Sequence, residues 1–251
     1  MIKPLLRNAI ETLVRRFDYR LTDVLSDPPG LAGACERLKA RGFDPRTVID
    51  VGVGPGTPWL YAAFPKARFE LFEPNDAFRP AIEAETEGLD VGVHYCALGA
   101  EAAAQALEVN LATPTSSSMA GYRASYLSQG DGLDAPPTVT RHVDVRRLDD
   151  FGPFEGPVLL KLDVEGYEAH VLRGAARALQ QVEVIISEVS VAQRTEAELP
   201  LGAFLAFVES LGFSLINIAE INPIRRGGPI AYLDAVFVRS DSPMRGGAGT
   251  A

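Results

Sequence analysis

Short apolar runs alternate with helix-like stretches along most of this chain. Four segments have the spacing of amphipathic helices, at 57–64, 76–87, 167–180 and 199–211. Runs rich in β-branched and aromatic residues predict seven strands, at 47–51, 68–72, 91–97, 158–164, 182–189, 213–221 and 232–239. This alternation predicts an α/β fold with a mostly parallel seven-stranded sheet and helices on both of its faces.

The last two predicted strands are joined by a loop and not by a helix. The joining segment contains Asn222-Pro223 and the stretch 225–229, which have the composition of a turn. A short connection of this kind joins antiparallel strands. We therefore expect the last strand to run antiparallel to its neighbour, which is more typical of methyltransferases than of dehydrogenases.

The pattern divides the chain into a helical segment at 1–42, one domain at 43–240 and a disordered tail at 241–251. Within the domain, residues 107–147 interrupt the alternation and predict a strand, a long loop and a returning strand on the ligand side. Residues 2–20 predict a basic amphipathic helix that packs on the domain, with contact to a membrane surface as the alternative.

Composition narrows the class of protein. The chain has 251 residues, 47% of them hydrophobic, and a formal net charge of −9, which argues against nucleic acid as a partner. No apolar run is long enough for a transmembrane segment, and the N-terminus lacks the pattern of a signal peptide. The two cysteines, Cys35 and Cys96, are expected to be free thiols in a reducing compartment, so we predict a cytoplasmic protein. The oligomeric state is not predicted.

A glycine-rich turn follows the first predicted strand. Gly52, Val53, Gly54 and Gly56 come between that strand and a helix, and glycines there let the backbone approach a ligand closely. The third glycine comes one residue too early for a dinucleotide fingerprint. Asp50 precedes the turn, and its carboxylate suits a cationic ligand such as S-adenosylmethionine better than a pyrophosphate.

The ends of the second and third strands supply further candidates for a nucleoside site. Glu73 ends the second strand, and a carboxylate at this position can accept both ribose hydroxyls. Pro74 then fixes the loop. Ala97 lies where the third strand ends, and by topology this turn borders the adenine.

The fourth predicted strand ends in a group of charged residues. Lys161 and Asp163 share one face of it, because side chains alternate along a strand. We expect Asp163 near the reacting centre, with Lys161 adjusting its properties and Glu165 as a second candidate base. Glu188 ends the fifth strand at the same edge, where it either faces the ligand or pairs with a neighbouring helix.

A histidine is a common base for removing a hydroxyl proton. Of the three histidines, His142 is preferred because it lies in the strand that closes the long insertion. No spacing of histidine and carboxylate residues fits a tight metal site, so no metal is predicted.

Several of these segments together resemble the FkbM family of methyltransferases. The family pattern has a D-x-G-x-x-x-G turn, an E-P pair, a "tLDd" element and a K-x-D-v-E-G segment, the last being the most specific. The matching positions are Val48–Gly56, Phe72–Pro74, Ala97–Gly99, Ser116–Ser118, Val145–Asp150, Leu160–Gly166, Gly174 and Ile185–Val189.

This resemblance covers roughly residues 43–240. It implies a Rossmann-like methyltransferase fold that uses S-adenosylmethionine, usually to methylate a hydroxyl on a sugar, glycolipid or secondary metabolite. It implies that Asp50, the three glycines, Glu73 and Asp163 contact the cofactor. The chain has Thr57-Pro58 after the turn and lacks the Ala-Asn of many members, so the acceptor cannot be transferred from the family.

Three rival classes and one internal alternative stay open at this point. A purely structural or interaction role is one of the rival classes, and it leaves the carboxylates at the strand ends unexplained. A non-catalytic module that binds S-adenosylmethionine would keep the same turn and the same carboxylates. An NAD-dependent oxidoreductase conflicts with the glycine spacing. Methylation of nitrogen would use the same cofactor site as methylation of oxygen.

Overall fold

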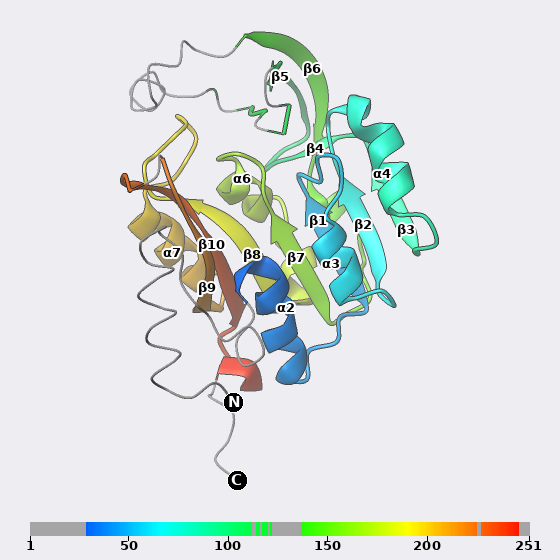
Figure 1. The fold of residues 1–251 in the computed structure, drawn as a ribbon, viewed down its shortest axis with the longest axis vertical. Coiled ribbons are helices and arrows are strands. Elements are labelled where there is room, and N and C mark those ends of the chain that lie inside the picture. Colours follow the sequence, from blue (N-terminus) through cyan, green and yellow to red (C-terminus); the bar gives the residue numbers. More distant parts are fainter. Residues whose placement is uncertain are drawn as a thin grey trace, which may run out of the picture.

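The computed structural model describes residues 29–111, 114–115, 117–119, 121, 137–224 and 227–245. This part of the chain forms two sheets, the larger at its centre and the smaller, with β5 and β6, at one end (Figure 1). The larger sheet has seven strands in the order β3-β2-β1-β7-β8-β10-β9, and the smaller has three in the order β4-β6-β5. The seven-stranded sheet predicted from the sequence is therefore confirmed.

Most strands of the larger sheet begin and end close to the predicted positions. β10 is antiparallel to both β8 and β9, whereas β3, β2, β1, β7 and β8 pair in parallel, which confirms the predicted antiparallel last strand. The strands are β1 (Thr47–Val51), β2 (Arg68–Phe72), β3 (Val91–His94), β7 (Val158–Leu162), β8 (Val182–Ser190), β9 (Phe213–Pro223) and β10 (Ile230–Arg239).

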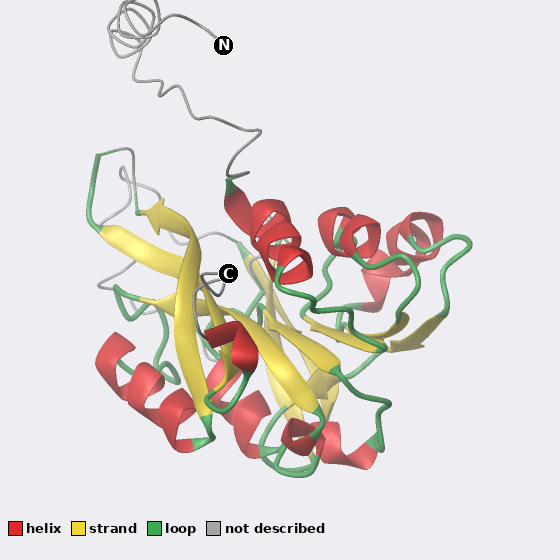
Figure 2. Cartoon of the chain, turned by 90° about the horizontal axis from the view of Figure 1, so that it is seen from below, coloured by secondary structure: helices red, strands yellow, loops and turns green. Residues whose placement is uncertain are grey.

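Helices cover both faces of this sheet (Figure 2). Every residue of β1 is buried, and its side chains alternate between two hydrophobic clusters: Val48 packs in one, Ile49 and Val51 in the other. The first cluster includes residues of α2 (Gly30–Ala40), α3 (Pro58–Ala63) and α4 (Arg79–Glu85), and the second includes residues of α6 (Glu168–Arg173) and α7 (Leu201–Ser210). Short 3-10 helices are η1 (Asp76–Phe78), η2 (Leu148–Asp150), η3 (Ala178–Gln180) and η4 (Pro243–Arg245).

The predicted strand at 91–97 is wrong in its second half. β3 ends at His94, and Ala97–Leu98 form a separate strand, β4, which pairs with β6 in the smaller sheet. The physical reason is that Ala97 finds its hydrogen-bonding partner at Val145 and not in β2. The chain therefore leaves the large sheet earlier than its continuous apolar pattern suggests.

The strand pair predicted within residues 107–147 is present but begins earlier. β5 (Ala103–Asn110) pairs antiparallel with β6 (Thr138–Arg146), from Ala103 opposite Val145 to Asn110 opposite Thr138. The first half of β5 is mostly exposed, so it lacks the alternation of apolar and polar residues that reveals a strand.

The two ends of the chain are described only in part. The predicted helix at 2–20, residues 122–136 of the long loop and residues 246–251 of the tail lie outside the described residues. The tail predicted as disordered is wrong at its start, because η4 buries Met244 and the Met244 carbonyl accepts a 2.7 Å hydrogen bond from Arg41 Nη1. Among the described helices, none has both the length and the apolar character needed to cross a membrane.

Candidate functional site

A cavity of about 350 Å³ lies at the carboxyl ends of β1, β2 and β7, where ligands bind in open parallel sheets. Most of the predicted site residues meet here: the lining includes Gly52, Val53, Gly54, Gly56, Glu73, Pro74, Ala97, Lys161, Asp163 and Glu165. A second cavity of about 410 Å³ lies between α2 and β9, but its lining contains no carboxylate. The first cavity is therefore the candidate site.

The glycine turn forms one wall of the cavity. Gly52 and Gly54 have φ angles of 78° and 57°, in the left-handed region that glycine enters at little cost. A Cβ atom on Gly52 would lie 1.8 Å from the backbone oxygen of Asp163, so only glycine allows β1 and β7 to approach this closely. The turn therefore presents bare backbone to the cavity.

Asp50 does not reach the cavity. Its side chain is 0% exposed beneath the turn, where it accepts a hydrogen bond from Thr57 Oγ1 and lies 3.1 Å from Lys161 Nζ. The sequence predicted a ligand contact, but in the structure Asp50 forms an internal ion pair and does not line the cavity. Through its contacts with Thr57 and Lys161, Asp50 stabilises the glycine turn from the buried side.

Lys161 contacts both the buried Asp50 and the residues that line the cavity. Its Nζ donates a 2.9 Å hydrogen bond to the Gly52 carbonyl and lies 3.4 Å from Asp163 Oδ2. Burial alone would lower the pKa of Lys161, but the charges of Asp50 and Asp163 raise it above its ordinary value. Lys161 is therefore a permanent cation that holds the turn and Asp163 in place, and it is not a proton acceptor.

Glu73 is tied to the backbone on both sides. Its Oε2 accepts a 2.8 Å hydrogen bond from Gly54 N–H, and its Oε1 accepts a 2.8 Å hydrogen bond from Asn75 N–H. Burial raises the pKa of Glu73 despite these bonds. The carboxylate thus fixes the glycine turn against the end of β2 while its outer edge lines the cavity.

The turn between β7 and α6 is held in an unusual backbone conformation. Glu165 has a φ of 52° and Gly166 a φ of 98°, so two consecutive residues are left-handed. Glu168 Oε1 accepts hydrogen bonds from Val164 N–H at 3.0 Å and Gly166 N–H at 3.2 Å, which satisfies the turn from inside. Glu165 lines the cavity and forms an ion pair with Arg194 at 3.2 Å.

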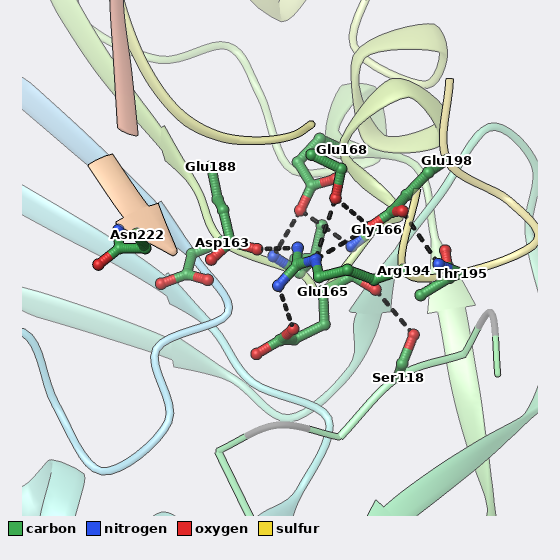
Figure 3. A network of polar contacts seen from close by, with 12 residues as sticks. Ser118, Asp163, Glu165, Gly166, Glu168, Glu188, Arg194, Thr195, Glu198 and Asn222 are labelled. Carbon is green, nitrogen blue, oxygen red and sulfur yellow. Dashed lines mark hydrogen bonds and ion pairs between the residues drawn. The ribbon is translucent and has the colours of Figure 1, made fainter. Parts of the chain in front are cut away.

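Arg194 is a residue that the sequence analysis missed. Its guanidinium is buried and forms ion pairs with Glu165 at 3.2 Å, with Glu198 at 3.4 Å and with Glu188 (Figure 3). It joins the end of β7, the end of β8 and the segment after β8. Only the fold brings these residues together, since Arg194 has no motif around it. Glu188 pairs with Arg194 in the loop after β8 and not with the predicted neighbouring helix, and it also lines the cavity.

The buried Glu168 predicts a pH dependence of stability. Burial raises its pKa from 4.5 to about 7, so the folded protein holds this proton more tightly than the unfolded chain. The resulting stabilisation is complete below pH 4.5 and is lost as the pH rises to about 7. Glu168→Gln keeps the Oε1 atom as a hydrogen-bond acceptor but removes the carboxyl group that titrates. Urea titrations measure the difference in free energy of unfolding between this variant and the wild type. From pH 4.5 to pH 8, this difference should shift in favour of the variant by on the order of 2 kcal/mol.

The control is Glu209→Gln on the exposed side of α7, for which the same difference should stay within about 0.5 kcal/mol. If the Glu168→Gln difference does not change with pH, the carboxyl group is not protonated in the folded protein at neutral pH.

Two other residues complete the survey of the site. His142 is exposed on β6 opposite Ala106 and does not line the cavity, so the structure does not bring the preferred histidine to the site. Asp234, which the sequence analysis did not single out, does line it. Within the described residues, no group of three or more histidine, cysteine or carboxylate side chains is arranged to hold a metal ion.

Comparison with known proteins gives the same assignment as the motifs. A family model described as "Methyltransferase FkbM domain" matches residues 50–215, well over half of the chain. A curated relative, Methyltransferase 1 of Beauveria bassiana (strain ARSEF 2860), is 30% identical over 148 residues, which cover 52% of this chain and 59% of that protein. The match thus spans less than two thirds of the length of that relative.

Solved structures with a similar outline are distant in sequence. Magnesium protoporphyrin IX methyltransferase of Synechocystis PCC 6803, with bound SAM, has 13% identity and a TM-score of 0.44, covering 95% of this chain and 97% of that chain. An O-methyltransferase of Bacillus cereus in complex with SAH has 12% identity and a TM-score of 0.42, covering 94% and 90%. Similarity at this level adds nothing to the family model, whose match spans the glycine turn, Glu73 and the β7–α6 turn. On that match, the chain belongs to the FkbM methyltransferase family.

Proposed function

We propose that this protein is an S-adenosylmethionine-dependent methyltransferase that methylates a hydroxyl oxygen of a small-molecule or glycan acceptor. The acceptor class is a sugar, a glycolipid or a secondary metabolite. The proposal rests on one observation: the glycine turn and several acidic side chains line the same cavity in a chain of the FkbM family.

The backbone of the turn fits a nucleoside cofactor. Gly54 leaves open the space that a Cβ would fill, whereas Gly52 lets the Asp163 backbone approach the turn, and Glu73 holds Gly54 through its N–H. In the proposal, Gly56, Pro74 and Ala97 complete the wall around the nucleoside. Glu73 offers its outer edge to the ribose hydroxyls while its two backbone hydrogen bonds hold it in place.

The charges of the cavity fit a cationic ligand. Asp163, Glu188 and Asp234 line it, whereas Lys161, the one cation among the described lining residues, already faces two carboxylates. Such a lining attracts a sulfonium and an amino group and repels a pyrophosphate. This excess of negative charge supports S-adenosylmethionine over NAD.

When bound, S-adenosylmethionine supplies the methyl group as a substituent of its sulfonium. The protein contributes mainly proximity and alignment, because a fixed in-line geometry removes much of the entropic cost of the transfer. Lys161 keeps Asp163 beside the reacting centre, and Arg194 holds Glu165 and Glu188 at the cavity edge. We place this reaction in the cytoplasm and assign it no nucleic-acid partner.

A binding and transfer experiment tests the proposal. Calorimetry of the purified chain should detect binding of S-adenosylmethionine and S-adenosylhomocysteine but not of NAD. Isotope-labelled methyl transfer to methyl α-L-rhamnopyranoside, methyl β-D-glucopyranoside or catechol, followed by mass spectrometry, should place the label on oxygen. Binding without transfer to any of these hydroxyl probes would instead favour a non-catalytic binding module.

Glu73→Gln should weaken cofactor binding by roughly 10-fold to 100-fold, about 1.4 to 2.7 kcal/mol. A glutamine has one acceptor oxygen, so it cannot accept from both Gly54 N–H and Asn75 N–H, and one backbone donor loses its partner. The dissociation constant of S-adenosylhomocysteine, measured by calorimetry, gives the effect.

The matched control is Glu70→Gln in β2, the strand that ends just before Glu73. Glu70 pairs with Arg68 and His94 and does not line the cavity, so affinity should stay within about 2-fold. Equal affinities for the two variants would contradict the role given to Glu73.

A further inference from the structure

A row of carboxylates crosses three strands at one side of the cavity. Glu188 in β8 lies directly opposite Asp234 in β10, and Asp163 follows Leu162, which pairs with Ser187 beside Glu188. Directly opposite side chains in an antiparallel pair project from the same face with Cβ atoms about 5 Å apart. Asp163, Glu188 and Asp234 therefore line one wall, and all three face the cavity.

Two of these carboxylates already have cationic partners. Asp163 faces Lys161 at 3.4 Å, and Glu188 forms an ion pair with Arg194. Among the described residues, no cation forms an ion pair with Asp234; its Oδ2 accepts a 3.2 Å hydrogen bond from Asn222 Nδ2, which holds the carboxyl group in place. Asp234 is therefore the carboxylate of this wall that is positioned without being neutralised.

The surroundings of Asp234 make it a proton acceptor suited to neutral pH. Burial first, and then the charges of Asp163 and Glu220, raise the pKa of Asp234 from 3.8 to about 7, while Lys161 and the Asn222 bond lower it. A base is most effective when its pKa lies near the working pH. Charged groups from three neighbouring strands and the segments that follow them face Asp234. Lys161 is in β7 and Asp163 directly follows it, Glu188 is in β8 and pairs with Arg194 in the next segment, and Glu220 is in β9.

The position of Asp234 along the sheet separates it from the nucleoside end of the cavity. The glycine turn and Glu73 follow β1 and β2, whereas Asp234 is in β10, on the other side of β7 and β8. Neighbouring strands are about 4.8 Å apart, so β10 lies about 14 Å from β1 across the sheet. This leaves room for a nucleoside at one end and an acceptor at the other.

We propose that the Asp234 carboxylate is the catalytic base that removes the proton from the acceptor hydroxyl. The assignment rests on the methyltransferase function proposed above. In this step Asp234 takes the hydroxyl proton, the acceptor oxygen forms its bond to the methyl carbon, and the electron pair of the broken carbon–sulfur bond stays on sulfur. The products are a methyl ether, a neutral thioether and a protonated Asp234, which returns its proton to solvent.

Asp234→Asn tests the assignment, because asparagine keeps the shape and the partner Asn222 but cannot accept this proton. With the hydroxyl probes named above, kcat should fall by about 100-fold or more, while the affinity for S-adenosylhomocysteine stays within about 3-fold. For the wild type, log kcat should rise with pH and level off above about 7, and this rise should be absent in the variant.

Glu220→Gln is the matched control, because it removes one charge that raises the pKa of Asp234 while leaving the carboxylate intact. Its maximal rate should match the wild type, with the rise in log kcat moved to lower pH.

A readout without the acceptor comes from carboxyl ¹³C NMR of aspartate-labelled protein. One resonance should titrate near pH 7 in the wild type and at lower pH in Glu220→Gln, and it should be missing in Asp234→Asn.

The possible failures are distinct. If Asp234→Asn transfers methyl at the wild-type rate, or if the NMR titration of Asp234 falls below pH 5, this assignment is overturned and the methyltransferase function stands. If the wild type binds the cofactor and transfers methyl to none of the hydroxyl probes, the proposed function itself is overturned, and the role of Asp234 with it.

Discussion

Lys161→Met should lower the free energy of unfolding by about 3–5 kcal/mol, because it leaves the fully buried Asp50 without its counter-charge. Thr57 would still donate to Asp50, but a hydroxyl does not neutralise a carboxylate. The Gly52 carbonyl would lose its 2.9 Å hydrogen bond as well. Urea unfolding at pH 7 measures the loss.

The second half of this experiment is a double-mutant cycle. Asp50→Asn combined with Lys161→Met removes both charges, so the double variant should be more stable than the sum of the two single changes predicts, by about 1–3 kcal/mol. Lys39→Met is the control, since Lys39 pairs with Glu36 on the exposed surface of α2 and should change stability by less than about 0.5 kcal/mol. A loss below about 1 kcal/mol for Lys161→Met would show that the pair is not needed.

Gly52→Ala should lower the rate of methyl transfer by about 100-fold or more. The added Cβ would meet the Asp163 carbonyl oxygen at 1.8 Å and its carbon at 2.8 Å, and both are backbone atoms that no rotamer change can move. The end of β7 must shift away from β1, carrying Asp163 with it. A displacement of about 1 Å at a reacting centre costs about 100-fold.

Gly88→Ala separates this steric effect from backbone strain. Gly88 has a φ of 81°, close to the 78° of Gly52, but nothing lies within 4 Å of the position of its Cβ. Its substitution should therefore cost only the left-handed conformation, about 1–2 kcal/mol, with the transfer rate unchanged. Equal effects of the two substitutions on the rate would mean that the close approach of β1 and β7 is not important for the reaction.

The sequence predicts those elements whose signal is local. β1 and β2 begin and end at the predicted residues, because each is a short apolar run bounded by turn residues. The glycine turn and the end of β7 were likewise visible as motifs. The late strand β4 was not, because its pairing with β6 depends on a partner far along the chain.

The same distinction explains what the sequence showed of the site. Asp50 was predicted to contact the cofactor, but its burial and its pairing with Lys161 depend on the register of β1 against β7, which the turn motif does not reveal. Arg194 and Asp234 have no surrounding motif, so only the fold reveals that one holds Glu165 and Glu188 and the other lines the cavity. His142 was preferred for its position in the insertion, and its exposure on β6 could not be read from the pattern.

The place of β10 after the matched region separates two parts of the proposed site along the sequence. The family model ends at residue 215, whereas Asp234 comes from the hairpin strand after it. In the proposed function, the residues assigned to the nucleoside and the residue assigned to the acceptor therefore lie in separate stretches of the chain. If so, substitutions in the final hairpin should change which molecule is modified and leave the methyl donor's site intact.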